Sequence, residues 1–140
     1  MVLVNDKLKG FASAMLRNKV VFSTDVVDGL GYVNIGRALS EALSGLEESS
    51  LTLKAADILK SLILQSASQH DLFGKYIALD NIGILFEPDM HINIEQLFQS
   101  VSTDAMLFLC SQHTIIDDCY LFMNSQECKV RLQTLSYISM

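Results

Sequence analysis

An aspartate closes the run of the sequence that most resembles a strand. Residues 75–80 are Lys-Tyr-Ile-Ala-Leu-Asp, and their β-favouring side chains predict a buried strand that ends at Asp80. A carboxylate at the carboxyl end of a buried strand can bind Mg²⁺ directly or through water. The next residue is Asn81, whose amide cannot accept a proton from an attacking water as a carboxylate base does. A purely structural alternative stays open, in which Asp80 caps the loop that follows.

A second apolar run, Ala105–Cys110, predicts a strand covered on both faces, and Ser111 and Gln112 follow it. A strand ending in aspartate is the Walker B pattern of P-loop nucleotide-binding proteins. In the relevant P-loop classes the next strand ends in a polar residue that senses the γ-phosphate. Ser111 or Gln112 stands at that place, although ordinary loop polarity is the simpler explanation for each residue taken singly.

The phosphate-binding loop itself is missing from the sequence. A P-loop needs G-x-x-x-x-G-K-[ST] directly after the first strand, because its backbone N–H groups and lysine hold the phosphates. Here the predicted first strand, residues 19–23, is followed by Thr24–Gly31 (TDVVDGLG), and no Gly-Lys-Ser/Thr occurs in the chain. Asp25 and Asp28 would repel a triphosphate. The helix that should follow the loop is not predicted either, so we expect no ATPase activity and no cofactor.

The other elements predict an α/β fold. Helices are expected at residues 5–17, 35–43, 51–68 and 92–102, and further extended segments at 32–34, 119–123 and 132–138. Asn5 or Asp6 caps the first helix in this prediction, with the following side chains on its inner face: Leu8, Phe11, Met15 and Leu16. Gly45 is expected to end the second helix, and residues 47–50 to form a polar connection. Alternating strands and helices predict a mostly parallel sheet in a three-layer sandwich, formed by one domain over residues 1–140.

Composition limits the classes of function. The formal net charge of −6 disfavours direct nucleic-acid binding, because an acidic surface repels phosphates. No segment has the roughly 18 apolar residues that cross a membrane. The N-terminus does not resemble a signal peptide. Three cysteines without a CxxC pair favour the reducing cytoplasm over a disulfide framework.

The cysteines and histidines give no metal or nucleophile motif. The three histidines, at positions 70, 91 and 113, are far apart and lack metal-ligand spacing. Cys110 and Cys119 lie in or beside apolar runs and are best explained as small buried hydrophobic residues. The pair Asp117-Asp118 is expected in a solvated loop.

Two stretches of the chain resemble a known family. Tyr32–Ser40 (YVNIGRALS) and Leu79–Pro88 (LDNIGILFEP) resemble the small P-loop-containing protein of BREX-type bacterial phage-defence systems, over roughly residues 30–125. The resemblance implies a P-loop NTPase-like fold, degenerate here because Walker A is lost, with Asp80, Asn81 and Ser111 as remnants of the site. It also implies a non-catalytic accessory component of an antiviral defence system. Such a component would act through protein–protein interaction with other proteins of the system or through self-association.

Two alternatives remain open at this point. The chain could be an ATP-binding switch or weak ATPase with a non-standard loop, in which Lys19 or Arg37 supplies positive charge and Asp80 holds the Mg²⁺ of Mg-ATP. It could also be a phage-encoded mimic or regulator of such a system.

Overall fold

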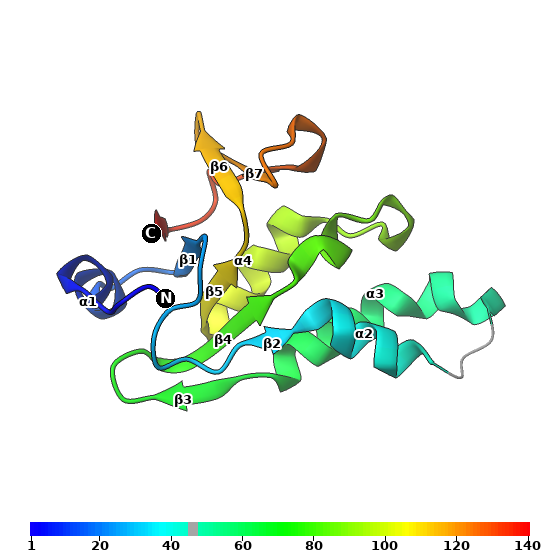
Figure 1. The fold of residues 1–140 in the computed structure, drawn as a ribbon, viewed down its shortest axis with the longest axis horizontal. Coiled ribbons are helices and arrows are strands. Elements are labelled where there is room, and N and C mark those ends of the chain that lie inside the picture. The colour runs from blue at the N-terminus through cyan, green and yellow to red at the C-terminus, as the bar shows by residue number, and fades with distance from the viewer. Residues whose placement is uncertain (45–47) are drawn as a thin grey trace.

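The computed structural model describes residues 1–44 and 48–140, and Figure 1 shows their arrangement. The helices are α1 (Asp6–Ser13), α2 (Ile35–Leu43), α3 (Glu48–Gln65) and α4 (Ile94–Asp104), with 3₁₀ turns η1 (Ile82–Phe86), η2 (Pro88–Met90) and η3 (Gln126–Cys128). The first five strands are β1 (Val20–Ser23), β2 (Val33–Asn34), β3 (Ser68–His70), β4 (Gly74–Asp80) and β5 (Met106–Cys110). The others are β6 (His113–Ile116), β7 (Cys119–Phe122), β8 (Lys129–Arg131) and β9 (Tyr137–Ser139).

The main sheet is mostly parallel, as the sequence predicts. Its strand order is β2-β4-β5-β1-β9, and every neighbouring pair along this path is parallel. Strand β3 pairs antiparallel with the first half of β4. Because the five strands run the same way, their carboxyl ends meet at one edge of the sheet.

The two faces of this sheet are covered unequally. Side chains of Phe22, Ile77 and Leu107 point into a large core shared with α2, α3 and α4. Their neighbours in the strands, among them Val21 and Phe108, point to the other face, where the buried helical partner is Leu8 of α1. We call these the thick face and the thin face. Helical layers on both faces make the molecule an α/β fold of three layers.

The connection from β1 to β2 contains no helix. Residues 24–32 form turns and one isolated parallel bridge between Val2 and Val27. Helix α1, which covers the thin face, precedes β1 in the chain. The prediction that no helix follows the first strand is therefore confirmed.

The strands predicted at 19–23, 75–80 and 105–110 are confirmed as β1, β4 and β5, and all five residues of β5 are buried. The helix predicted at 5–17 is capped by Asn5 as expected but ends at Ser13, because the chain turns at Ala14 to enter β1. The inner face predicted for this helix was wrong in part, since Met15 is fully exposed and Leu16 is 42% exposed.

Three further predictions need correction. The polar connection at 47–50 is wrong for 48–50, which begin α3, while residue 47 and the predicted stop at Gly45 lie outside the described residues. Helix α3 ends at Gln65, because residues from 68 onward form β3. The segments expected at 119–123 and 132–138 overlap β7 and β9, but β8 between them was not predicted.

A second, antiparallel sheet of order β6-β7-β8 lies between β5 and β9 in the chain. Asp117 and Asp118 form the tight β6–β7 turn with positive φ angles of 52° and 59°, which confirms the predicted loop. The Tyr137 hydroxyl donates to Asp118 at 2.7 Å, and this bond raises the pKa of Tyr137 to about 12. Among the described helices, none is long and apolar enough to span a membrane.

Candidate functional site

Four residues form a row across the carboxyl edge of the sheet. Asn34 of β2 pairs with Asp80 of β4, and Ser23 of β1 pairs with Cys110 of β5. Since Leu79 pairs with Leu109, Asp80 is level with Cys110. Residues level with one another in parallel strands point to the same face, and this row points to the thin face, as Val21 and Phe108 two positions earlier do. The structure thus brings the predicted remnants to one edge.

Asp80 contacts the turn that follows it. Its Oδ1 accepts a hydrogen bond from the backbone N–H of Asn81 at 2.8 Å. Asn81 has a left-handed backbone, with φ 52° and ψ 52°, and stands before η1. A short polar side chain tolerates this conformation better than an apolar one. Asp80 therefore has the contact of a loop cap, which is the structural alternative left open by the sequence.

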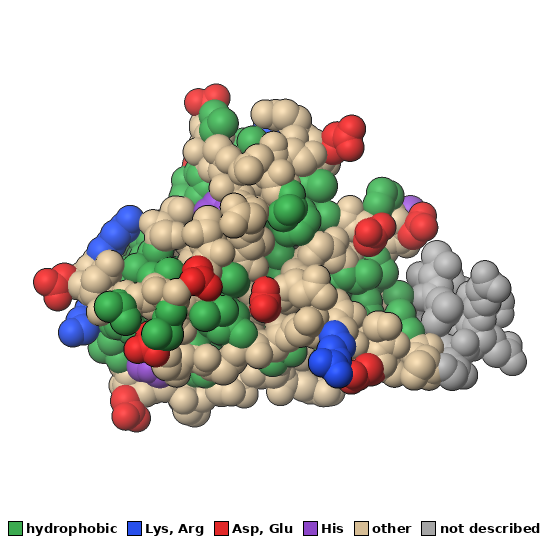
Figure 2. Space-filling model, in the orientation of Figure 1, with side chains coloured by type: hydrophobic (Ala, Val, Ile, Leu, Met, Phe, Trp, Pro, Cys, Tyr) green, Lys and Arg blue, Asp and Glu red, His purple; other side chains and the backbone are tan. Residues whose placement is uncertain are grey.

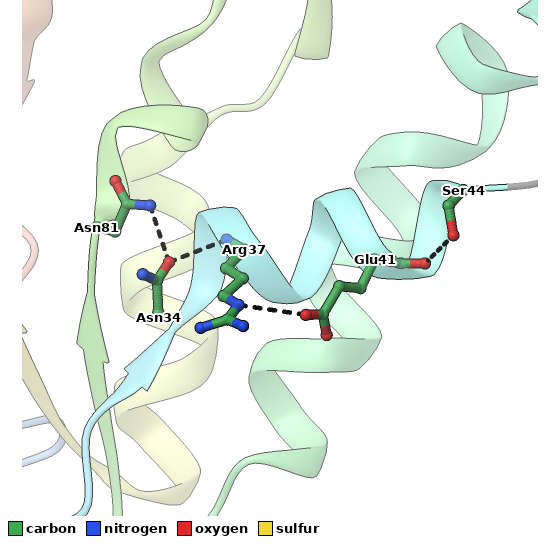
Figure 3. A network of polar contacts seen from close by, with 5 residues as sticks. All are labelled: Asn34, Arg37, Glu41, Ser44 and Asn81. Atoms are coloured by element: carbon green, nitrogen blue, oxygen red, sulfur yellow. Dashed lines mark hydrogen bonds and ion pairs between the residues drawn. The ribbon is translucent and has the colours of Figure 1, made fainter.

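Asn81 lies against the start of α2 (Figure 3). Its Nδ2 donates to Asn34 Oδ1 at 2.8 Å, and the same oxygen caps α2 by accepting from the Arg37 backbone N–H at 2.9 Å. Gly36 makes this approach possible, because a Cβ there would stand 2.7 Å from Asn81 Nδ2. The Arg37 side chain pairs instead with Glu41 at 3.2 Å, on the outer side of the helix.

Ser111, the predicted phosphate sensor, is bound to the second sheet. Its hydroxyl is hydrogen-bonded to the hydroxyl of Tyr120, and its backbone N–H donates to Ser23 O at 2.9 Å. Tyr120 is fully buried and stacks on Phe22 at a centroid distance of 4.7 Å. Burial raises the pKa of Tyr120 to about 12 despite the bond to Ser111. The hairpin of β6 and β7 thus fixes the end of β5, while Gln112 is exposed.

Backbone N–H groups of the segment after β1 are already hydrogen-bonded within the protein. The N–H of Val26 donates to Asp25 Oδ1 at 2.8 Å, and the N–H of Val27 donates to the Tyr32 hydroxyl at 3.1 Å. The N–H of Asp28 donates to Val2 O at 2.8 Å. Further along, the N–H of Gly31 donates to the Tyr76 hydroxyl at 3.0 Å. These are the groups that a phosphate-binding loop must leave free for its ligand.

Tyr32 stands against the row of strand ends. Burial raises the pKa of its phenol, the negative charges of Cys110 and Asp80 raise it further, and hydrogen bonding to the Val27 N–H and Ser23 opposes this rise. The pKa of the Cys110 thiol is raised as well, first by burial and then by the charges of Asp80 and Asp25. A thiol with a raised pKa is a poor nucleophile at neutral pH. The Ser23 hydroxyl is buried without a hydrogen bond of normal geometry and has Tyr32 as its polar neighbour.

The charge near the carboxyl edge of the main sheet is negative rather than positive. Asp25 and Asp28 are exposed in the loop, and the terminal amino group of Met1 pairs with Asp25 and lowers the pKa of its carboxyl. Lys19, considered as a source of positive charge, starts from the opposite end of β1 and donates to Ala12 O of α1. Arg37 is held by Glu41. Neither cation therefore serves the strand ends.

Sequence reasoning did not single out the two tyrosines that fill this edge. Tyr32 lies there with Asp80 and Cys110 as neighbours, and Tyr120 stacks on Phe22, and these partners are distant in the sequence. Only the β-favouring character of the segments around the two tyrosines is visible in the sequence. Surface hollows of about 160–370 Å³ lie elsewhere, for example between α3 and α4 and beside β8. Within the described residues, no group of three or more His, Cys, Asp or Glu side chains could hold a metal ion.

Comparison with known proteins adds no assignment. No family model matches the chain, and no significant match was found among the curated proteins or the solved structures.

Proposed function

We propose that this chain is a non-catalytic domain derived from a P-loop fold, and that it acts through protein surfaces instead of binding nucleotide. The observation that carries the proposal is the state of the loop after β1. Its N–H groups at positions 26, 27, 28 and 31 are bound within the protein, and the Tyr32 hydroxyl is one of their acceptors. A nucleotide would have to break these bonds and approach two aspartates.

The strand order supports descent from a P-loop fold. In the P-loop class with an additional central strand, that strand lies between the first strand and the Walker B strand and ends in the sensor residue. Here β5 lies between β1 and β4, Asp80 ends β4, and Ser111 follows β5. In this proposal Asp80, Asn81 and Ser111 are remnants that now hold loops in place.

The setting we propose is a bacterial anti-phage system, in which the chain is an accessory component. The two stretches that carry the family resemblance meet in space, through the bond from Asn81 Nδ2 to Asn34 Oδ1 and the close approach at Gly36. This contact gives the shared residues a structural reason to occur together. It requires no nucleotide.

Isothermal titration with Mg-ATP tests the absence of nucleotide binding. We expect no saturable heat from the wild-type chain, and none from Tyr32→Phe, which removes the hydroxyl that holds the Val27 N–H. Micromolar binding by the wild type, abolished by Asp80→Ala, would overturn the proposal in favour of an ATP-binding switch.

Gene neighbourhood and co-purification test the setting. Genes for a methyltransferase and a PglZ-like phosphatase beside this one, and co-purification of this chain with a product of that cluster, are the expected results. A location within a phage genome would instead favour a mimic or regulator of the system.

A further inference from the structure

The cover of the thin face presents opposite charges on its two halves. One half is the segment between β1 and β2, where Asp25 and Asp28 are exposed and Asp25 pairs with the terminal amino group of Met1. The other half is α1 with the link to β1, where the exposed cations Lys7, Lys9 and Arg17 outnumber the one exposed carboxylate, Asp6, and make no ion pair among the described residues. We call these the acidic half and the basic half. They adjoin, because Leu8 of α1 and Val27 of the segment pack in the same cluster.

Apolar side chains are exposed on the same cover. Leu3 is 65% exposed beside the Val2–Val27 bridge, and Met15 is fully exposed at the end of α1. Figure 2 shows hydrophobic side chains gathered over the region where Figure 1 places α1, the N-terminus and the β1–β2 segment, with acidic side chains among them. Exposed apolar area of this kind marks interaction surfaces in many soluble proteins.

A glycine on α1 gives an independent reason to expect a close neighbour. Gly10 lies inside the helix, where glycine is less favourable than alanine, and its φ angle is not one that requires glycine. A Cβ at this position would have no atom of the described chain within 4 Å. The missing side chain therefore serves no contact within the protein, but it would allow a second backbone to approach the helix.

We propose that this cover is the interface of a symmetric dimer of the chain. A two-fold axis places each half of a surface on the other half of its copy, so the acidic half of one protomer meets the basic half of its partner. Attraction between the halves fixes the register of the pair, and Leu3 and Met15 supply apolar area to bury. The inference rests on the proposed function in one respect, namely that the domain acts through its surface.

Sedimentation velocity of the purified chain over a range of concentrations tests the dimer. We expect a reversible dimer in the micromolar range that weakens as salt is raised, since exposed charges are screened. Two variants reverse one half each, Asp25→Lys/Asp28→Lys and Lys9→Glu/Arg17→Glu. Each should be monomeric alone, and an equimolar mixture should form a 1:1 heterodimer. Glu87→Lys/Asp89→Lys, on exposed residues near η2, makes the same charge change away from the face and should leave the dimer intact.

Gly10→Ala separates association from folding. Alanine should raise the melting temperature, because it favours the helix, and should weaken dimerisation by roughly tenfold, because the new methyl group holds the partner's β1–β2 segment away from α1. Ser100→Ala, at an exposed position of α4, is the matched control and should leave association unchanged.

A wild-type chain that is monomeric at all concentrations overturns the dimer, as does a dimer that both charge variants leave intact or that Glu87→Lys/Asp89→Lys breaks equally. None of these results alters the titration with Mg-ATP, so failure of the dimer and failure of the proposed function are distinguishable.

Discussion

The two faces of the sheet differ in how their covering arose. The thick face is covered by α2, α3 and α4, which lie in the connections between parallel strands. The thin face lacks a connecting helix after β1, and α1 together with the N-terminal strand segment covers it instead. A connection without a helix leaves apolar sheet surface uncovered, and here residues from another part of the chain bury that surface. The N-terminal segment also binds one amide group of the β1–β2 segment, because Val2 O accepts a hydrogen bond from the Asp28 N–H.

The largest expected effect distinguishes the two cores. Phe22 and Phe108 are both completely buried, the first on the thick face and the second on the thin face. Phe22→Ala should reduce the free energy of unfolding by about 4–5 kcal/mol and Phe108→Ala by about 3 kcal/mol, because a thin cover can collapse into the cavity more easily. Urea unfolding of both variants measures the difference. Equal losses would mean that the thin face is packed as rigidly as the thick one.

Removing the α1 anchor tests the covering itself. Leu8 is completely buried against the thin face, whereas Met15, seven residues later, is fully exposed. Leu8→Ala should cost about 3 kcal/mol of stability, and Met15→Ala less than about 0.5 kcal/mol. Thermal unfolding compares the two. A small loss for Leu8→Ala would show that α1 contributes little to the fold.

Raising the pH should weaken the contact between the second sheet and the thick face. Burial raises the pKa of Tyr120 from 10.0 to about 12 in the folded protein. The folded state therefore favours the protonated phenol, so this stability is complete below pH 10 and is lost as pH rises through about 12. The loss due to Tyr120 should approach roughly 2–3 kcal/mol.

Urea unfolding of the wild type and Tyr120→Phe at pH 8 and pH 11.5 isolates this contribution. The variant should be slightly less stable at pH 8, because the Ser111 hydroxyl loses its partner, but should lose less stability at high pH. Parallel losses in both proteins would contradict the assignment to Tyr120.

Buried strands were predictable from the sequence because their signal is local. The run that became β5 is apolar along its whole length, and those that became β1 and β4 have consecutive apolar residues at their centres, so buried strands were visible without knowledge of their neighbours. Strand β3 (Ser-Gln-His) and the strands β6 and β8 of the second sheet lack this signal, since their side chains are largely exposed or only partly buried. They exist because a neighbouring strand offers backbone partners.

The positions of the candidate residues were predictable, but their contacts were not. Asp80 and Ser111 were placed at strand ends that meet at one edge, as the parallel sheet requires. Asn81 is hydrogen-bonded to Asn34, which lies 47 positions away in the sequence. Ser111 is hydrogen-bonded to Tyr120 of the β6–β7 hairpin, which was not predicted to pack there. The two acidic residues of the β1–β2 segment and its lack of a helix were predicted correctly from the sequence. The contacts of Tyr32 were not, because they depend on the path of the backbone.

The smallest expected effect concerns the contact that joins the two stretches of family resemblance. A Cβ at Gly36 would stand 2.7 Å from Asn81 Nδ2 and 3.2 Å from Asn81 O, so Gly36→Ala should cost about 1 kcal/mol even though alanine favours the helix. Asn81→Gly keeps the left-handed backbone, with its φ of 52°, and removes the obstructing side chain. In that background Gly36→Ala should be nearly neutral, which gives a coupling of about 1 kcal/mol between the two positions in a double-mutant cycle of urea unfolding. Additive losses would show that the backbone carbonyl at position 81, and not the Asn81 side-chain amide, requires glycine at position 36.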